Sequence, residues 1–207
     1  LMKVLLINGS PHEKGCTYTA LSLIAGELKA QGIETEILHV GGQPVGGCIG
    51  CGGCRSGNGC VFGGVVNEAI EKAKTADAFV FGSPVHYASA AGNMASFMDR
   101  LAYAGGKYLA YKPAAVCCSA RRAGTTSTLD QLVKYPQFFH MPLVNGSYWA
   151  MVHGSNPEQV LQDAEGCAVM QELGRNMAWL LHCIEAGKAA GIDHPQNPPR
   201  PMTSFIR

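Results

Sequence analysis

The chain has 207 residues, of which 47% are hydrophobic and only 15% are charged, and its formal net charge at pH 7 is +1. This length fits one domain with a full core, the near-neutral charge gives no electrostatic case for a nucleic acid or an anionic membrane as partner, and no apolar run approaches the roughly 20 residues of a membrane span. Nine cysteines are an odd number, and the N-terminus shows no signal-peptide pattern, so we expect reduced thiols in a cytoplasmic protein.

Short apolar runs alternate with amphipathic helices along the chain. The expected strands cover residues 3–8, 33–40, 78–82, 113–119 and 140–144. The expected helices cover residues 17–31 and 65–75, a segment carrying Met94, Phe97, Met98 and Leu101, a segment ending near 135, and residues 165–186. This alternation predicts an α/β fold: a flavodoxin-like, doubly wound, five-stranded parallel sheet of order 2-1-3-4-5, in three layers.

Two segments show no regular pattern. Residues 41–64 are rich in glycine and cysteine, and residues 188–207 are rich in proline. We therefore expect a single domain over residues 1–187, with 41–64 as a loop, and an irregular tail over 188–207 that lies on the body or on a partner.

Three polar loops, at residues 9–17, 83–93 and 119–127, follow the first, third and fourth expected strands. Ligands of open α/β sheets bind beyond the carboxyl ends of the strands, where the strand order reverses, so these loops are expected to meet at one site. The first loop opens a helix, whose free N–H groups favour a phosphate, and Ser10 and Thr17 add hydroxyl donors. In the alternative interpretation, Ser10 and Thr17 only cap the helix.

The second loop begins Ser-Pro-Val-His-Tyr. Pro84 stiffens it, and its backbone amides together with His86 and Tyr87 are suited to frame a flat heteroaromatic ring. The alternative is an ordinary loop with exposed aromatic side chains.

Four cysteines, Cys48, Cys51, Cys54 and Cys60, have the spacing C-x2-C-x2-C-x5-C. Thiolates this close in a glycine-rich loop can converge on a [4Fe–4S] cluster or on a zinc ion. A metal-free thiol loop is the third alternative, and the spacing leaves all three open.

The segments GSPHEKGCT, GSPVHYASAAGNMASFMDR and SARRAG, together with the cysteine cluster, resemble the NADPH-dependent FMN reductase family and its iron–sulfur flavoprotein branch over about residues 2–149. The resemblance implies non-covalent FMN in a homodimer or a dimer of dimers. Cys16 replaces a commoner Asn and His86 a commoner Tyr. The residues that the resemblance places at FMN are Ser10, His12, Cys16, Thr17 and Tyr18 at the phosphate, Pro84, Val85, His86 and Tyr87 at the isoalloxazine and ribityl groups, and Ser119, Ala120, Arg121 and Gly124 at the second edge of the ring.

The family further implies that NADPH or NADH reduces FMN and that a small acceptor of the quinone, nitro, azo or free flavin type takes the electrons, with no catalytic side chain required. Arg121 and Arg122 either meet a phosphate of the nicotinamide nucleotide or are solvated loop charges. Two alternatives remain at this point: an electron carrier with a [4Fe–4S] cluster on the four cysteines, and a non-enzymatic FMN-binding regulatory domain.

Overall fold

The structure is a computed structural model that describes residues 1–203 and 205. The strands are β1 (Lys3–Asn8), β2 (Glu34–His39), β3 (Ala78–His86), β4 (Ser89–Ala90), β5 (Ala114–Ala120) and β6 (Met151–His153). They form a sheet of order β2-β1-β3-β5-β6, to which β4 adds by pairing with β3. All pairs are parallel except β3 with β4. The order of the five parallel strands confirms the predicted flavodoxin-like topology.

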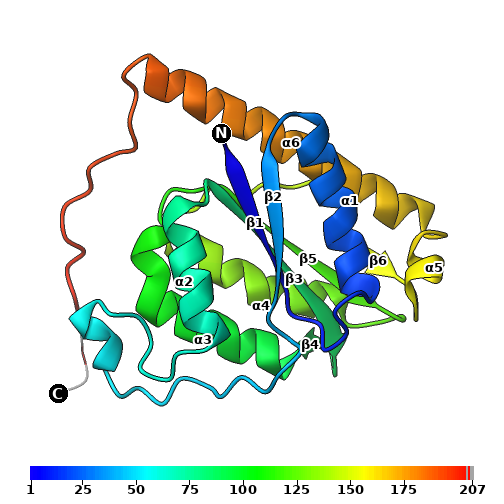
Figure 1. Cartoon of the computed structure of the whole chain (residues 1–207), viewed down its shortest axis with the longest axis horizontal. Helices are drawn as coiled ribbons and strands as arrows, with labels where there is room; N and C mark the ends of the chain where they lie inside the picture. The colour runs from blue at the N-terminus through cyan, green and yellow to red at the C-terminus, as the bar shows by residue number, and fades with distance from the viewer. Residues whose placement is uncertain (204, 206–207) are drawn as a thin grey trace.

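Helices cover both faces of the sheet and complete three layers (Figure 1). The helical elements are α1 (Cys16–Ala30), η1 (Gly53–Ser56), α2 (Val65–Thr75), α3 (Gly92–Gly105), η2 (Gly106–Tyr108), α4 (Thr125–Phe138), α5 (Pro157–Val160) and α6 (Ala164–Ala189). One face of the sheet packs on α1 and α6, and the other on α2, α3 and α4.

Strand β1 shows why its sequence is an unbroken apolar run. Val4 and Leu6 belong to the core cluster on the α1 and α6 face, whereas Leu5 and Ile7 belong to the cluster on the α2 and α3 face. All four are at most 1% exposed. A central parallel strand is buried on both faces, so it needs hydrophobic side chains at every position.

The predicted fifth strand at residues 140–144 is wrong. The fifth parallel strand is β6, and the expected segment makes only one isolated bridge, between Leu143 and Ala114. Pro142 has no N–H to donate, and His140 has a left-handed φ of 56°. Both features prevent a regular ladder from extending through this segment.

Strand β3 is longer than predicted. It continues beyond Gly82 to His86 and then turns back, so that Val85 pairs with Ala90 and His86 with Ser89. Part of the expected loop at 83–93 is therefore a hairpin that projects from the carboxyl end of a central strand.

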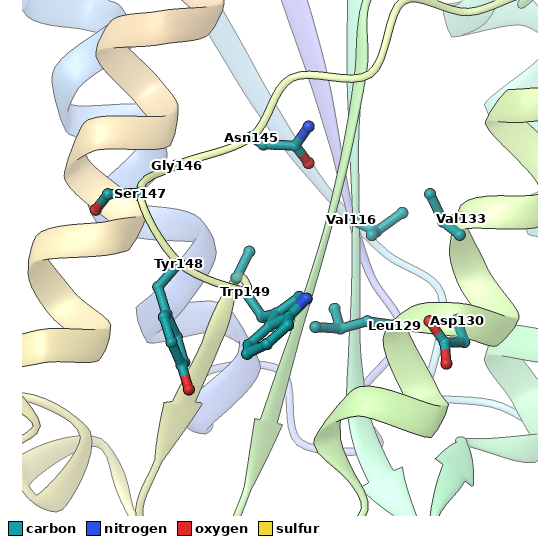
Figure 2. A pocket seen from close by; sticks show the side chains of 10 residues that line it. Val116, Leu129, Asp130, Val133, Asn145, Gly146, Ser147, Tyr148 and Trp149 are labelled. Carbon is teal, nitrogen blue, oxygen red and sulfur yellow. The ribbon is translucent and has the colours of Figure 1, made fainter.

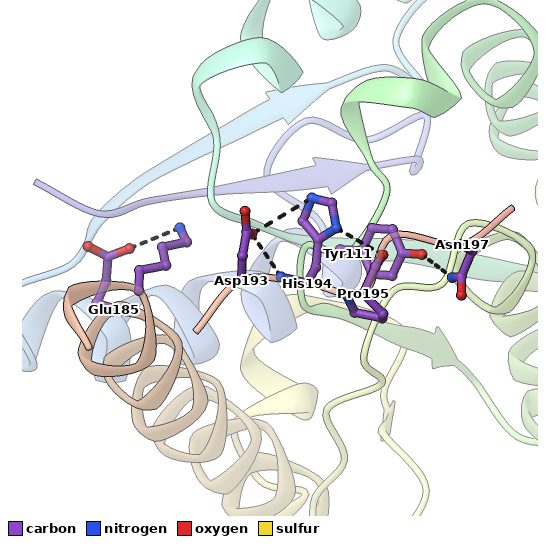
Figure 3. Close-up of polar contacts among 7 residues, drawn as sticks. Tyr111, Glu185, Asp193, His194, Pro195 and Asn197 are labelled. Atoms are coloured by element: carbon purple, nitrogen blue, oxygen red, sulfur yellow. Dashed lines mark hydrogen bonds and ion pairs between the residues drawn. The ribbon is translucent and has the colours of Figure 1, made fainter. Parts of the chain in front are cut away.

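The segment after α6 returns along the body, and its described residues past Ala190 form no regular element. The His194 ring stacks on Tyr111 with ring centroids 4.4 Å apart, and the Asn197 amide donates to the Tyr111 hydroxyl at 2.6 Å (Figure 3). Among the helices that the structure describes, none combines the length and the apolar character needed to cross a membrane.

Candidate functional site

The three predicted loops meet at the carboxyl edge of the sheet. The Gly9 N–H donates to the Gly82 carbonyl at 2.9 Å, which joins the first loop to β3. Thr17 and Ser119, which are buried, share a hydrogen bond of 2.8 Å between their hydroxyl oxygens. Pro84 lies opposite Ser119 in the β3–β5 register. The ends of β1, β3 and β5 and the first turn of α1 therefore form one continuous surface.

The N-terminus of α1 has no side-chain cap. Its N-cap residue is Gly15, and the first turn contains no acidic residue. The Ser10 hydroxyl instead accepts a hydrogen bond from the His12 N–H at 3.1 Å, and the Thr17 hydroxyl is engaged with Ser119. The interpretation that Ser10 and Thr17 cap the helix is therefore wrong. Free N–H groups and the positive end of the helix dipole suit an anion such as a phosphate.

The end of β2 and the segment after it fix the shape of the first loop. The ring of His39 makes a hydrogen bond of 2.7 Å between its Nε2 and the Ser10 carbonyl oxygen. A Cβ atom at Gly41 would lie 2.2 Å from that same oxygen and 2.5 Å from the Gly9 carbonyl oxygen. Only glycine permits this approach of two backbone segments.

The hairpin between β3 and β4 turns through Tyr87 and Ala88, both in the left-handed region, with φ of 49° and 59°. Two-residue hairpins of this kind favour Asn-Gly, so a Tyr-Ala pair holds the backbone in a strained conformation. The Tyr87 side chain is fully exposed at the tip. The predicted ring-binding residues thus include one that projects freely from the edge.

Contacts from α4 hold this strained turn in place. The Ser127 hydroxyl donates to the Ala88 carbonyl at 2.7 Å. The Gln131 side-chain oxygen accepts from the Ser89 hydroxyl at 2.6 Å and from the Ala90 N–H at 2.9 Å. Gly124, with φ of 93°, lies so close that a Cβ there would meet the Ala88 Cα at 2.7 Å. The hairpin and the start of α4 therefore form one unit.

The loop after β5 brings positive charge to the same edge. Ser119 and Ala120 are buried at the end of the strand, whereas Arg121 and Arg122 are exposed. Neither arginine takes part in an ion pair among the residues that the structure describes. Helix α4 begins after Gly124 without a side-chain cap and without an acidic residue in its first turn. A second helix N-terminus without a cap thus follows the loop after β5 at this edge of the sheet.

The end of β6 also borders this edge, which the sequence did not indicate because the fifth strand was misplaced. The Gly154 N–H donates to the Ala120 carbonyl at 3.0 Å, and the Cys16 thiol donates to the Gly154 carbonyl at 3.5 Å. Burial raises the pKa of Cys16, so its thiol stays protonated. His153 precedes this contact, with its Nδ1 3.6 Å from a carboxylate oxygen of Asp163, the N-cap residue of α6. An Asp placed just before a helical pattern is a sequence signal that was overlooked here.

The remaining predicted site residues differ in exposure. His12 and His86 are exposed, whereas Tyr18, Pro84 and Val85 are half-buried. The geometry thus brings the predicted residues to one edge, with buried hydroxyls at its base and exposed rings at its rim.

The four clustered cysteines line one cavity of about 330 Å³, which we call the cysteine pocket: Cys48, Cys51, Cys54 and Cys60, with Arg55, Phe62, Arg100 and Tyr103 around them. All nine cysteines of the chain are free. Within the described residues, no three potential ligands are close enough together to hold one metal ion. This arrangement does not fit structural zinc. A four-iron cluster is larger than an ion, and four thiols around one cavity fit that donor set.

Cys117 and Cys118 are buried in β5, as expected of small hydrophobic side chains. Burial raises the pKa of Cys118 to about 12 and raises that of Cys117 as well. Both thiols are therefore protonated and unreactive at neutral pH.

Two larger cavities border α4. One of about 490 Å³ is bordered by Tyr148 and Trp149 and by Leu129 of α4, and Figure 2 shows the Trp149 ring lying between the loop and that leucine. The other, of about 540 Å³, lies between α3 and α4, where the Tyr135 hydroxyl donates to Asp99 at 2.6 Å. Neither is lined by the residues predicted to bind FMN.

Comparison with known proteins places the chain among flavoproteins. An iron-sulfur flavoprotein of Methanocaldococcus jannaschii is 28% identical over 192 residues, which cover 89% of this chain and all of that protein. Among solved structures, RosB has a TM-score of 0.69 at 14% identity, covering 100% of this chain and 94% of that one. An NAD(P)H:quinone oxidoreductase from Methanothermobacter marburgensis has a TM-score of 0.65 at 17% identity, covering 85% and 96%. At these identities the two structures show the fold alone.

A family model also matches most of the chain. Residues 2–156 match the family described as NADPH-dependent FMN reductase, and this span contains all three loops, the hairpin and the four clustered cysteines. The chain therefore belongs to the NADPH-dependent FMN reductase family of flavodoxin-like oxidoreductases.

Proposed function

We propose that the chain binds FMN at the carboxyl edge of its sheet, takes electrons from NADPH or NADH, and passes them to a small acceptor of the quinone, nitro, azo or free flavin type. The observation that carries this proposal is the N-terminus of α1. It has no side-chain cap and no first-turn acid, and the Thr17–Ser119 hydrogen bond fixes it to β5.

The FMN phosphate is assigned to the first turn of α1, at Ser10, His12, Cys16, Thr17 and Tyr18. Backbone N–H groups there donate to the phosphate, and the helix dipole favours its negative charge. The protonated Cys16 thiol adds no charge that would repel it.

The isoalloxazine ring is assigned to the strained hairpin and the loop after β5. Pro84, Val85, His86 and Tyr87 border one side, and Ser119, Ala120, Arg121 and Gly124 the other. Because α4 fixes the Tyr87–Ala88 turn, its backbone is ordered before the ring arrives, which lowers the entropic cost of binding.

Bound FMN supplies the redox chemistry, by accepting a hydride from the nicotinamide and releasing electrons to the acceptor. The role of the chain is to bind and orient the ring. Exposed Arg121 and Arg122 provide positive charge for the phosphates of the nicotinamide nucleotide. No side-chain nucleophile or general base is needed.

The test is an anaerobic visible spectrum of the FMN-loaded protein before and after addition of NADPH or NADH. We expect the flavin absorbance to bleach with at least one nucleotide and to return when a quinone is added. Flavin that stays oxidised with both nucleotides would refute the nicotinamide-dependent function.

A second candidate function is electron transfer through an iron–sulfur cluster in the cysteine pocket. Four thiols around one cavity favour it, and the relative from Methanocaldococcus jannaschii is named an iron-sulfur flavoprotein. The pocket is also close to the FMN edge. Asn93 in the first turn of α3 donates to the Gly41 and Gln43 carbonyls, and Arg100 lies seven residues, or about 10 Å, further along the helix.

Iron and sulfide assays on anaerobically purified protein separate the two candidates. About four iron and four sulfide per chain, lost when Cys51 is replaced by Ser, would support the electron-transfer function. Protein without iron that still oxidises NADPH or NADH would leave the first function alone.

A further inference from the structure

Arg100 is a buried cation that no acidic group neutralises. Its side chain lies on α3 and is 6% exposed, and it is the one charged residue among the buried polar residues that the structure describes. No ion pair of the described chain includes it. The adjacent Asp99 accepts a hydrogen bond from Tyr135 instead. A buried charge is costly unless it is paired, so this position calls for a negative partner.

Arg100 donates all of its hydrogen bonds to the loop of residues 41–64, which carries the four clustered cysteines. Its Nε donates to the Cys60 sulfur at 3.3 Å, one terminal nitrogen donates to the Gly46 carbonyl at 3.3 Å, and the other donates to the Gly63 carbonyl at 3.0 Å. Gly46 precedes the four cysteines and Gly63 follows them. One guanidinium therefore holds both ends of the loop and one of its sulfurs against α3.

None of these acceptors supplies the full negative charge that would neutralise Arg100. Two carbonyls carry only partial charges, and a neutral thiol is a weak acceptor, whereas a thiolate forms a strong, charge-assisted hydrogen bond. The Phe62 ring, 5.7 Å from the guanidinium carbon, adds a cation–π contact but no countercharge. Arg100 lines the same cavity as the four cysteines. The cavity is therefore electrostatically suited to an anionic centre held by sulfur.

We propose that Arg100 is a positioning residue for a sulfur-ligated iron–sulfur centre in the cysteine pocket, and that its charge and its hydrogen bond to the Cys60 sulfur raise the reduction potential of that centre. The proposal rests on the second candidate function. Four thiolates make such a centre negative, and reduction adds one electron while breaking no bond, so its negative charge increases. A guanidinium fixed beside a ligand sulfur stabilises the reduced form more than the oxidised form.

The experiment compares Arg100→Gln with Arg55→Gln after anaerobic reconstitution with ferrous iron and sulfide. Both arginines line the cysteine pocket and both changes remove one positive charge, but Arg55 is exposed and Arg100 is buried. The readouts are iron content and the one-electron reduction potential from a spectroscopic titration with dithionite. For Arg100→Gln we expect the reduction potential to fall by at least about 59 mV, which for a one-electron couple is a tenfold shift toward the oxidised form. For Arg55→Gln we expect a potential close to that of the wild type.

The outcomes distinguish a failure of the proposed role of Arg100 from the absence of a cluster. Equal potentials for the two variants would overturn the role of Arg100 and leave the cluster in place. A wild type that takes up no iron but still binds reducible FMN would overturn both the cluster and this role, and would leave the oxidoreductase function intact. If Arg100→Gln does not fold, Arg100→Lys decides. It keeps the charge but loses the planar fork, so we expect a smaller shift in the same direction, and an unchanged potential would contradict the proposal.

Discussion

Replacing Gly41 with Ala tests whether the shape of the first loop is what holds the FMN phosphate. The added methyl carbon would lie 2.2 Å from the Ser10 carbonyl oxygen and 2.4 Å from the Ser10 carbonyl carbon. This is more than 1 Å inside the usual contact distance of about 3.5 Å. Both neighbours are backbone atoms, so no rotamer change relieves the overlap, and the Ser10 segment must move.

The expected cost follows from this overlap. Overpacking of this kind destabilises by about 1–3 kcal/mol. If the strain is relieved by displacing the loop, the same energy is lost from phosphate binding, which corresponds to an FMN dissociation constant raised about 5- to 150-fold. Quenching of FMN fluorescence measures that constant, and urea unfolding of the FMN-free protein measures the stability.

A matched control lies in the same segment as Gly41, residues 41–64. At Gly47 a Cβ would have the Ser96 hydroxyl as its nearest neighbour, at an ordinary distance of 3.8 Å. Gly47→Ala should therefore leave both quantities unchanged. A Gly41→Ala protein with the FMN affinity and the stability of the Gly47→Ala protein would refute the reasoning.

Two further predictions concern stability. Thr17→Val and Ser119→Ala each break the buried hydroxyl pair and should each lower the free energy of unfolding by about 1–2 kcal/mol. The double variant should lose clearly less than the sum, and strict additivity in urea unfolding would contradict the contact. Hydrogen bonds from Lys3 and then Lys72 lower the pKa of Glu36, so its contribution to stability is present above the unfolded-state pKa and is lost as the pH falls through the folded-state pKa. The stability difference between the wild type and Glu36→Gln should thus be present at pH 7 and shrink in acid, and a difference independent of pH would argue against this pair.

The parallel sheet was predictable because its strands are buried on both faces. Runs such as residues 3–8 and 78–82 show this directly as continuous apolar sequence. Strand β6 was not predictable, because Met151–His153 spans three residues and lies at the edge of the sheet, where alternation is too short to recognise. Residues 140–144 have the apolar content of a strand, and only the local backbone, with Pro142 and left-handed His140, prevents one.

The candidate site, like the fold, could be predicted from the sequence only in part. Loops after strands locate the edge from sequence alone, since parallel strands place their carboxyl ends together. The contact between Thr17 and Ser119 joins residues 102 positions apart, and no local pattern encodes it. The strain at Tyr87 and Ala88 was also hidden, because Tyr-Ala is not a turn sequence and tertiary contacts from α4 impose it. In the sequence, Arg100 is only the last residue of the segment that resembles the family. Its burial, on which its proposed role depends, is known only from the structure.

The most direct test of the central claim compares FMN with riboflavin, which lacks the phosphate, in calorimetric titrations of the flavin-free protein. At least two charge-assisted hydrogen bonds to the phosphate, at about 1.5 kcal/mol each, predict that FMN binds at least about 100-fold more tightly than riboflavin. Equal affinities for the two flavins would show that the N-terminus of α1 does not hold a phosphate, and would contradict the assignment of the site.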